Sequence, residues 1–240
     1  MAKRKIAVYG LRRSGNHAFV EWLNKNLGGS LEQHRVSPYM TYCGKSCYVN
    51  SIAEYENTSA LDINYRFADF TFENLIVTYE DVPFAYEASQ ARGFPKIVLI
   101  RDILNVVASR YKMLSMHRPD QIEKGNLCSV NESMFQTWLN HASVVPSHRI
   151  KLVKFESWIT SLAYRNKISE LIGFKNIDAM HEISFHGGGS SFTGRLRVPT
   201  PNELKNRWKE VKIPTKFLDR ISASDISLAR KKLGYEPQAF

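Results

Sequence analysis

The stretch KIAVYGLRRSGNH, residues 5–17, determines how the fold begins. Its apolar run at Ile6–Tyr9 predicts a buried strand, and the pattern of apolar residues over Gly15–Leu27 predicts a helix. The glycine-containing turn between them presents backbone N–H groups at a helix N-terminus, where the helix dipole also favours a negative charge. The chain is therefore expected to open with a strand, an anion-binding turn and a helix.

The two glycines of this turn have the G-x-x-x-x-G spacing of a nucleotide-binding P-loop. A Walker A loop continues with Lys and then Ser or Thr, whose hydroxyl holds Mg²⁺, but this chain has Asn16 and His17 at those positions. The positive charge lies earlier, on Arg12 and Arg13. Because guanidinium groups bind phosphate and sulfate directly, the turn indicates an oxyanion site that needs no metal.

A second signal follows the apolar strand predicted at Lys96–Ile100. This strand ends in Arg101-Asp102, and Ser109 lies eight residues after Arg101, about two turns into the next predicted helix. Ligands of open α/β sheets bind beyond the carboxyl ends of the strands, which is where Arg101 falls. An Arg-Asp pair at such a place is also compatible with a purely structural ion pair.

The rest of the chain alternates short β-branched runs with helical patterns, which predicts an α/β fold with a parallel sheet. Residues 37–72 are rich in Tyr, Asn and Ser and have little periodicity, so we expect an irregular insert or lid there. With no internal repeat or low-complexity linker, residues 1–240 are expected to form one domain. The expected strands are Lys5–Tyr9, Leu75–Tyr79, Lys96–Ile100 and Ile150–Lys154.

The charge distribution favours a specific anion pocket over a uniform nucleic-acid-binding surface. The chain of 240 residues carries a formal net charge of +10. Residues 36–95 have a net charge of −5, so the remainder carries +15. Three cysteines give no disulfide framework, which favours a reducing cytoplasm, and no apolar run reaches the length of about 18 residues that spans a bilayer.

Together, the Arg-Ser-Gly turn and the later stretch IVLIRDILNVVAS, residues 97–109, resemble the sulfotransferase family. The stretch KFESW at residues 154–158 is similar to the strand and helix that follow the core of that family. The resemblance covers residues 5–30 and 75–235. It implies a three-layer, P-loop-like α/β fold and the use of 3′-phosphoadenosine 5′-phosphosulfate (PAPS) as sulfuryl donor, with adenosine 3′,5′-bisphosphate as the product.

The resemblance also implies a donor site with two ends. Arg101 and Ser109 match the residues that hold the 3′-phosphate in the family. Arg13 stands where the family has a basic residue that contacts the bridging oxygen, and the first loop is expected to grip the 5′-phosphosulfate. The loop residues are Arg12, Arg13, Ser14, Gly15, Asn16 and His17. Three positions depart from the family pattern: the common Lys is Arg13, the usual Thr-Thr is Asn16-His17, and the Pro after Arg-Asp is Ile103.

Sulfuryl transfer to an alcohol or amine needs a group that removes the acceptor proton. The predicted strand Leu75–Tyr79 ends in Glu80-Asp81, at the place where the resemblance expects that base. We take Glu80 as the base, because a Glu recurs there in the carbohydrate-modifying branch that the chain resembles. Asp81 and His17 are the alternative bases. The structural alternative is that Glu80 and Asp81 are only solvated charges at the end of a strand.

The most glycine-dense stretch is HGGGSSFTGR, residues 186–195. Glycines allow the backbone to approach a ligand closely, and a late basic loop closes over the nucleotide in the resembled family. The candidate ligands of the 3′-phosphate end in this loop are Ser191, Thr193, Gly194 and Arg195. A flexible surface loop is the alternative interpretation.

These observations predict a PAPS-dependent sulfotransferase that transfers a sulfuryl group in line, without a metal ion, to a hydroxyl or amine of a small molecule or glycan such as a carbohydrate. Two other functions stay open at this point. One is a P-loop kinase of a small metabolite or nucleotide, and the other is a basic nucleic-acid-binding protein without catalysis. The oligomeric state is not predicted.

Overall fold

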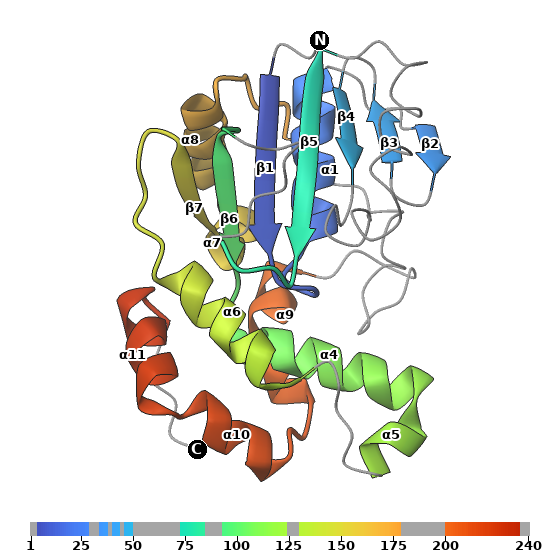
Figure 1. The fold of residues 1–240 in the computed structure, drawn as a ribbon, viewed down its shortest axis with the longest axis vertical. Coiled ribbons are helices and arrows are strands. Elements are labelled where there is room, and N and C mark those ends of the chain that lie inside the picture. Colours follow the sequence, from blue (N-terminus) through green and yellow to red (C-terminus); the bar gives the residue numbers. More distant parts are fainter. Residues whose placement is uncertain are drawn as a thin grey trace.

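A computed structural model describes residues 4–28, 34–37, 40–43, 46–49, 73–84, 93–123, 130–178 and 200–235. Within these ranges the strands form one sheet in the order β2-β3-β4-β5-β1-β6-β7, and Figure 1 shows it above a group of helices. The strand bounds are β1 Arg4–Gly10, β2 His34–Ser37, β3 Met40–Cys43, β4 Ser46–Val49, β5 Asn74–Glu80, β6 Lys96–Ile100 and β7 Ile150–Lys154.

The centre of the sheet is parallel, as predicted. β1 pairs in parallel with β5 on one side and with β6 on the other, and β6 pairs in parallel with β7. The central strand is buried on both faces: Ile6 and Val8 contribute to one apolar cluster, and Ala7 and Tyr9 to another. This burial explains why the strand appears in the sequence as a continuous apolar run instead of an alternating pattern.

The prediction of an irregular insert at residues 37–72 is wrong for its first part, which contains β3 and β4. β3 and β4 form an antiparallel pair, and β4 extends the sheet by pairing in parallel with β5. Each of these strands has four residues, which is too few for a period-two pattern to stand out from its polar surroundings. Residues 50–72 lie outside the described residues.

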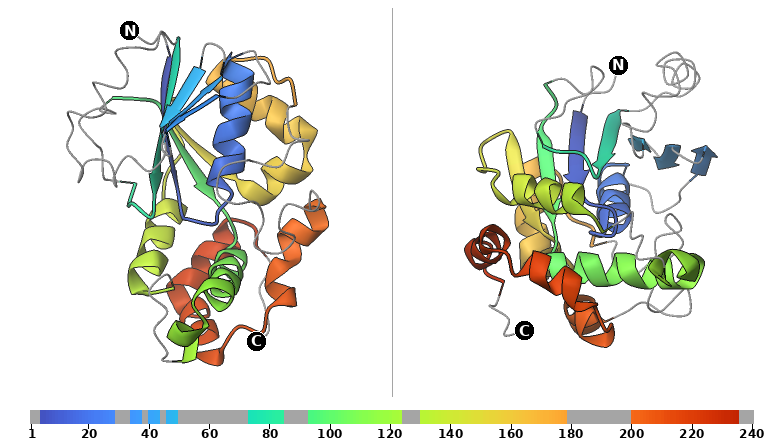
Figure 2. Two further views of the ribbon diagram at one scale, coloured as in Figure 1. Left: turned by 90° about the vertical axis from the view of Figure 1, so that its right-hand side faces the viewer. Right: turned by 60° about the horizontal axis from the view of Figure 1, so that its bottom comes forward.

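Helices cover one face of the sheet and its carboxyl end (Figures 1 and 2). α1, α7 and α8 pack with the strands through a buried cluster that includes Phe19, Trp22 and Trp158. α4, α6, α10 and α11 form a second cluster beyond the ends of the strands. The helix bounds are α1 Asn16–Gly28, α4 Ile103–His117, α5 Pro119–Glu123, α6 Glu132–Ala142, α7 Phe155–Thr160, α8 Leu162–Ile172, α9 Pro201–Asn206, the 3₁₀ turn η2 Arg207–Glu210, α10 Thr215–Ile221 and α11 Ser224–Lys232.

Within the described part of the chain, no helix combines the length and the apolar character needed to cross a membrane. The longest described helix, α4, has 15 residues and contains Arg110 and Lys112.

Candidate functional site at the carboxyl ends of the sheet

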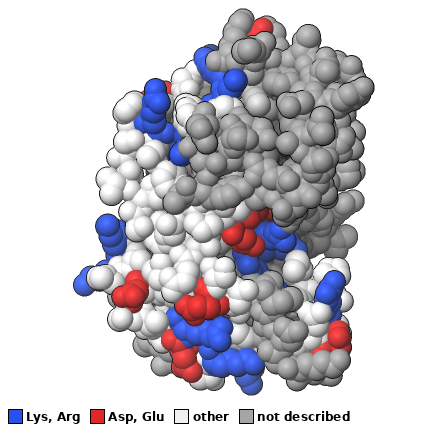
Figure 3. All heavy atoms as spheres, in the orientation of Figure 1, with Lys and Arg blue, Asp and Glu red and all other residues white. Residues whose placement is uncertain are grey.

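The topology brings the two predicted anion signals to one edge of the molecule. β1 lies between β5 and β6, so the segments that follow these three parallel strands share the carboxyl edge of the sheet. Those segments carry the turn at residues 11–15, the pair Glu80-Asp81 and the pair Arg101-Asp102. Acidic and basic side chains lie side by side at the height where the strands end in Figure 3.

The turn at residues 11–15 has a backbone that few sequences tolerate. Arg13 and Gly15 have φ angles of 72° and 89°, in the left-handed region that favours glycine. A Cβ atom on Gly15 would lie 2.1 Å from the Phe155 ring, and one on Gly10 would lie 2.0 Å from Oδ1 of Asn16. Both glycines are therefore required for the turn to pack closely, and the turn leads directly into the first residue of α1.

Asp81 and Arg110 bind the main chain of the turn. Oδ1 of Asp81 accepts a hydrogen bond of 3.0 Å from the backbone N–H of Arg12 and forms an ion pair with the Arg110 guanidinium. Nε and Nη2 of Arg110 also donate to the carbonyl oxygen of Arg12, at 3.2 and 3.1 Å. Burial lowers the pKa of Arg110, and the Asp81 carboxylate partly opposes this shift. The main chain at Arg12 is thus fixed on both its N–H and its carbonyl.

Glu80 faces the start of α1. Its Oε1 accepts a hydrogen bond of 3.0 Å from Nδ2 of Asn16 and lies 3.8 Å from Nε2 of His17. The Glu80 side chain is 8% exposed and that of His17 is 29% exposed. Nδ2 of Asn16 also donates to the carbonyl of Leu11, at 3.1 Å. The predicted base, the alternative base and the turn at residues 11–15 therefore form one connected group.

Arg13 belongs to the same group. Burial lowers the pKa of its guanidinium, the charge of Glu80 raises it, and the charge of Arg110 lowers it further. The charge of Arg13 is therefore coupled to those of Glu80 and Arg110. An anion that reached Arg13 would be stabilised by its guanidinium group.

Arg101 lies beneath the turn and is only 2% exposed. Its Nη1 donates to the carbonyl of Arg13 at 2.9 Å, its Nη2 donates to the carbonyl of Leu204 at 2.8 Å, and its guanidinium lies over the Phe155 ring, 4.8 Å from the centroid. Burial lowers the pKa of Arg101, and Glu156 is the main charge that opposes this shift. The residue predicted to be a ligand anchor is also a structural link between the turn and α9.

A carboxylate and the last helix support Arg101 from the other side. Oε1 of Glu156 lies 4.0 Å from Nε of Arg101 and accepts the backbone N–H of Asp102 at 3.0 Å, while Oε2 accepts the hydroxyl of Tyr235 at 2.9 Å. Burial raises the pKa of Glu156. Arg230 of α11 binds both carboxylate oxygens of Asp102, at 3.0 and 3.1 Å. The C-terminal helix thus stabilises the end of β6.

Ser109 lies within α4 and is 3% exposed, next to Arg110 in the chain. A further buried cation, Arg207 of η2, lies near Arg101, whose charge contributes to lowering the pKa of Arg207 to about 10; burial is the larger cause. The predicted ligands Ser191, Thr193, Gly194 and Arg195 lie outside the described residues.

Sequence reasoning gave no site role to Arg110, Phe155, Glu156 or Arg207. Phe155 and Glu156 follow the end of β7, and the position of β7 beside β6 is what brings them to Arg101. Arg110 is adjacent to Ser109, and that adjacency was the available signal. Among the described residues, no group of three or more His, Cys, Asp or Glu side chains is placed to hold a metal ion.

Comparisons with known proteins identify the fold. No family model and no curated protein matches the chain. Three solved structures cover nearly all of it: a sulfotransferase domain from the Synechococcus olefin synthase (13% identity, TM-score 0.57, 99% of this chain and 97% of that one), the mouse sulfotransferase SULT7A1 complexed with PAP (11%, 0.52, 98% and 90%), and a sulfotransferase domain from the curacin biosynthetic pathway (14%, 0.51, 99% and 100%). The chain therefore has the P-loop-like α/β fold of sulfotransferase domains.

Proposed function

We propose that this protein is a PAPS-dependent sulfotransferase that moves a sulfuryl group to a hydroxyl or amine acceptor. The observation that carries the proposal is the convergence at one sheet edge of a left-handed, arginine-bearing turn, a carboxylate and a buried arginine that binds the turn. The fold agrees with this function, and one neighbour of the same fold is complexed with PAP, the abbreviation for adenosine 3′,5′-bisphosphate.

The residues at this edge suit a donor with anionic groups at two points. The turn and the start of α1 would hold the 5′-phosphosulfate through Arg12, Arg13, Ser14, Gly15, Asn16 and His17. The 3′-phosphate would bind Arg101 and Ser109, with Arg207 nearby and Ser191, Thr193, Gly194 and Arg195 as further candidates. Nε of Arg101 is buried without a hydrogen-bond acceptor among the described residues, and such a donor is stabilised when an anion reaches it.

PAPS would supply the sulfuryl group when bound. Glu80 is proposed to accept the proton of the acceptor as its oxygen or nitrogen forms the new bond to sulfur, and Asn16 keeps the carboxylate oriented by its hydrogen bond of 3.0 Å. Arg13 is proposed to stabilise the negative charge that develops on the leaving phosphate, in the manner of an oxyanion hole. His17, 3.8 Å from Glu80, is proposed to bind phosphate in preference to acting as the base.

The acceptor is proposed to be a small molecule or a glycan, and the compartment the cytoplasm, where three cysteines in 240 residues remain reduced. Asp81 is not proposed to act as the base, because its Oδ1 already binds Arg12 and Arg110.

Isothermal titration with adenosine 3′,5′-bisphosphate and with Mg-ATP, each in the presence and absence of EDTA, tests this function. The proposal predicts that the bisphosphate binds more tightly than ATP and that EDTA leaves its affinity unchanged. Preferential binding of Mg-ATP that EDTA abolishes would support a P-loop kinase instead. Steep salt-dependent binding of oligonucleotides, with no response to either nucleotide, would support the nucleic-acid-binding alternative.

A further inference from the structure

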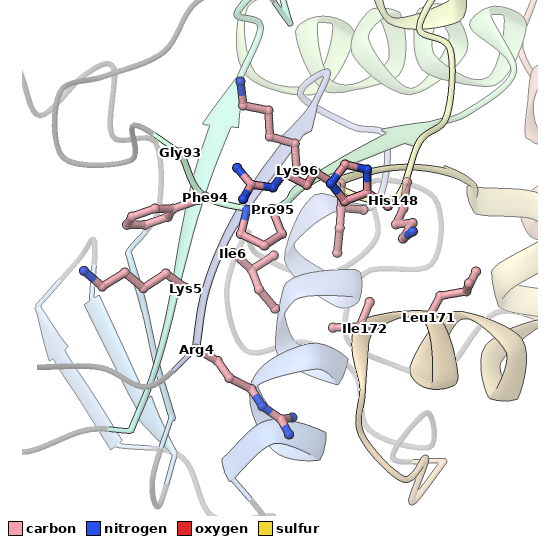
Figure 4. A pocket seen from close by; sticks show the side chains of 13 residues that line it. Arg4, Lys5, Ile6, Gly93, Phe94, Pro95, Lys96, His148, Leu171 and Ile172 are labelled. Carbon is pink, nitrogen blue, oxygen red and sulfur yellow. The ribbon is translucent and has the colours of Figure 1, made fainter.

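A cationic cavity of about 610 Å³ lies at the opposite edge of the sheet from the candidate donor site. It is lined at the amino ends of β1 and β6, by the segment before β7 and by the end of α8 (Figure 4). The first three residues of β1 line this cavity, and the last four, Ala7–Gly10, separate it from the turn at residues 11–15, a distance of about 13 Å along the strand. The cavity is therefore distinct from the donor site.

The described lining of this cavity is rich in basic residues. Five of them are Lys or Arg, and His148 adds a sixth basic group. Among the described residues that line the cavity, none is Asp or Glu. The backbone N–H of Arg4 donates to the carbonyl of Glu73 at 3.1 Å. The five cations are Arg4, Lys5, Lys96, Arg149 and Lys151. Nζ of Lys5 lies over the Phe94 ring and Nζ of Lys96 over the Phe84 ring, each 5.4 Å from the centroid. Stabilisation of an anion in the cavity therefore rests mainly on Arg4, Arg149 and Lys151.

The wall that carries His148 and Arg149 is preformed. Ser147 and Ile150 exchange backbone hydrogen bonds of 2.9 and 3.3 Å, which close a tight turn. Nζ of Lys151 donates to the carbonyl of Ser147 at 3.0 Å, and the backbone N–H of Lys96 donates to the carbonyl of Arg149 at 2.8 Å. The turn is thus tied to β6, and less ordering is required of it when a ligand binds.

The remaining lining is apolar. Phe94, Pro95 and Ile172 line the cavity, and Leu171, which is 53% exposed, lies at the end of α8. A volume of 610 Å³ lies within the range of small-molecule sites, about 300–1,000 Å³. A cavity with basic walls and an apolar patch suits a compact ligand better than an extended polymer, which needs a continuous groove.

We infer that this cavity binds a compact small molecule that carries two or more phosphate or sulfate groups on a non-ionic body. The site is independent of the proposed donor site, since it uses none of the same residues. Phosphorylated and sulfated ligands share clustered oxyanions. The two probes described below distinguish a phosphorylated ligand from a sulfated one.

The experiment is isothermal titration of the full chain with inositol hexakisphosphate and with sucrose octasulfate, at fixed ionic strength and with adenosine 3′,5′-bisphosphate present in excess. The pocket variant is Arg4→Gln with Arg149→Gln, two exposed residues on different walls. The matched control is Lys231→Gln with Lys232→Gln, which removes the same charge from exposed positions on α11.

The inference predicts 1:1 binding of at least one probe to the wild-type chain, roughly tenfold weaker binding to the pocket variant and near-wild-type binding to the control. Equal weakening in both variants would show general attraction to a basic protein and would overturn the inference. Failure of both probes to bind would also overturn it, as would a single-stranded DNA 20-mer that binds more tightly than both.

The affinity for adenosine 3′,5′-bisphosphate is measured separately on the same variants. The inference predicts no change in it, because the pocket and the donor site lie at opposite edges of the sheet. If the chain fails to bind the bisphosphate at all, the proposed function fails, and the comparison between the pocket variant and its control still tests the cavity.

Discussion

Arg101 and Arg13 are joined by a hydrogen bond of 2.9 Å, from Nη1 of Arg101 to the main-chain carbonyl of Arg13. These are the two residues proposed to contact opposite ends of the donor. The bond connects the turn at residues 11–15, with its φ of 72° at Arg13, to a buried guanidinium at the end of β6. A change at one end of the site is therefore expected to affect the other.

Replacement of Glu80 by Gln is expected to lower turnover about 10²- to 10⁴-fold, the usual contribution of a general base. Binding of adenosine 3′,5′-bisphosphate should survive, because Gln keeps an oxygen that accepts the hydrogen bond from Asn16. Release of the bisphosphate from PAPS, measured over a panel of hydroxyl and amine acceptors, checks the first effect, and calorimetry checks the second. The matched variant His17→Gln should instead weaken donor binding; a larger loss of turnover than in Glu80→Gln would make His17 the base.

Replacement of Asp81 by Asn should act on the turn and not on the proton transfer. The change removes the charge that pairs with Arg110 and weakens the acceptor for the Arg12 N–H. We expect the affinity for the bisphosphate to fall by about 1–3 kcal/mol, the scale of a hydrogen bond to a charged group. A titration that shows wild-type affinity would mean that the Asp81–Arg110 pair does not shape the site.

Arg207 gives a prediction about the 3′ end of the donor. Arg207 is buried, and the charge of Arg101 contributes to lowering its pKa. An anion bound at Arg101 would relieve this repulsion, so Arg207→Gln should weaken binding of the bisphosphate roughly tenfold. Lys209→Gln, two residues further in the same 3₁₀ turn and exposed, is the control and should bind normally. Equal affinities for the two variants would remove Arg207 from the site.

The burial of His141 leads to a prediction of how the free energy of unfolding depends on pH. Burial lowers its pKa from 6.5 to about 4, and its Nε2 lies 2.9 Å from the Val82 carbonyl. The unfolded chain therefore takes up this proton at a higher pH than the folded chain. Neutral His141 makes its full contribution to the free energy of unfolding above pH 6.5. This contribution, about 3 kcal/mol, is lost as the pH falls towards 4.

Urea unfolding between pH 4 and 7.5 checks this dependence. His141→Gln should flatten the acid limb of the stability profile, whereas His117→Gln, at an exposed position, should leave it unchanged. An identical acid limb in the wild type and the His141 variant would assign the loss of stability to other groups.

The sequence predicted the parallel centre of the fold because strands buried on both faces are continuous apolar runs. β1, β5, β6 and β7 were found in this way. β6 and β7 have the predicted bounds, and β1 and β5 each extend one residue further at both ends. β3 and β4 were missed because each is four residues long, and their pairing depends on neighbours that no local pattern reveals.

The position of the site could be predicted from the sequence, but the contacts between its side chains could not. Asp81 and Arg110 are 29 residues apart, and Glu156 and Tyr235 are 79 apart. The first pair meets because the end of β5 lies near α4, and the second because α7 lies near the segment that follows α11. Arg101 is buried by similar long-range contacts, with Arg13, Leu204 and Phe155. The sequence indicated a ligand anchor at the strand end, but it did not indicate that this arginine also binds the carbonyls of Arg13 and Leu204.

The central claim, that the end of β6 binds a 3′-phosphate, is tested most directly by a thermodynamic cycle. Adenosine 3′,5′-bisphosphate and 5′-AMP are titrated into the wild type, into Arg101→Gln and into Ser109→Ala, which leaves the contacts of Arg101 to Arg13 and Leu204 in place. We predict that the wild type prefers the bisphosphate and that this preference falls by about 1–3 kcal/mol in Arg101→Gln and by about 1 kcal/mol in Ser109→Ala. Equal binding of the two nucleotides to the wild type, or a preference that persists in both variants, would contradict it.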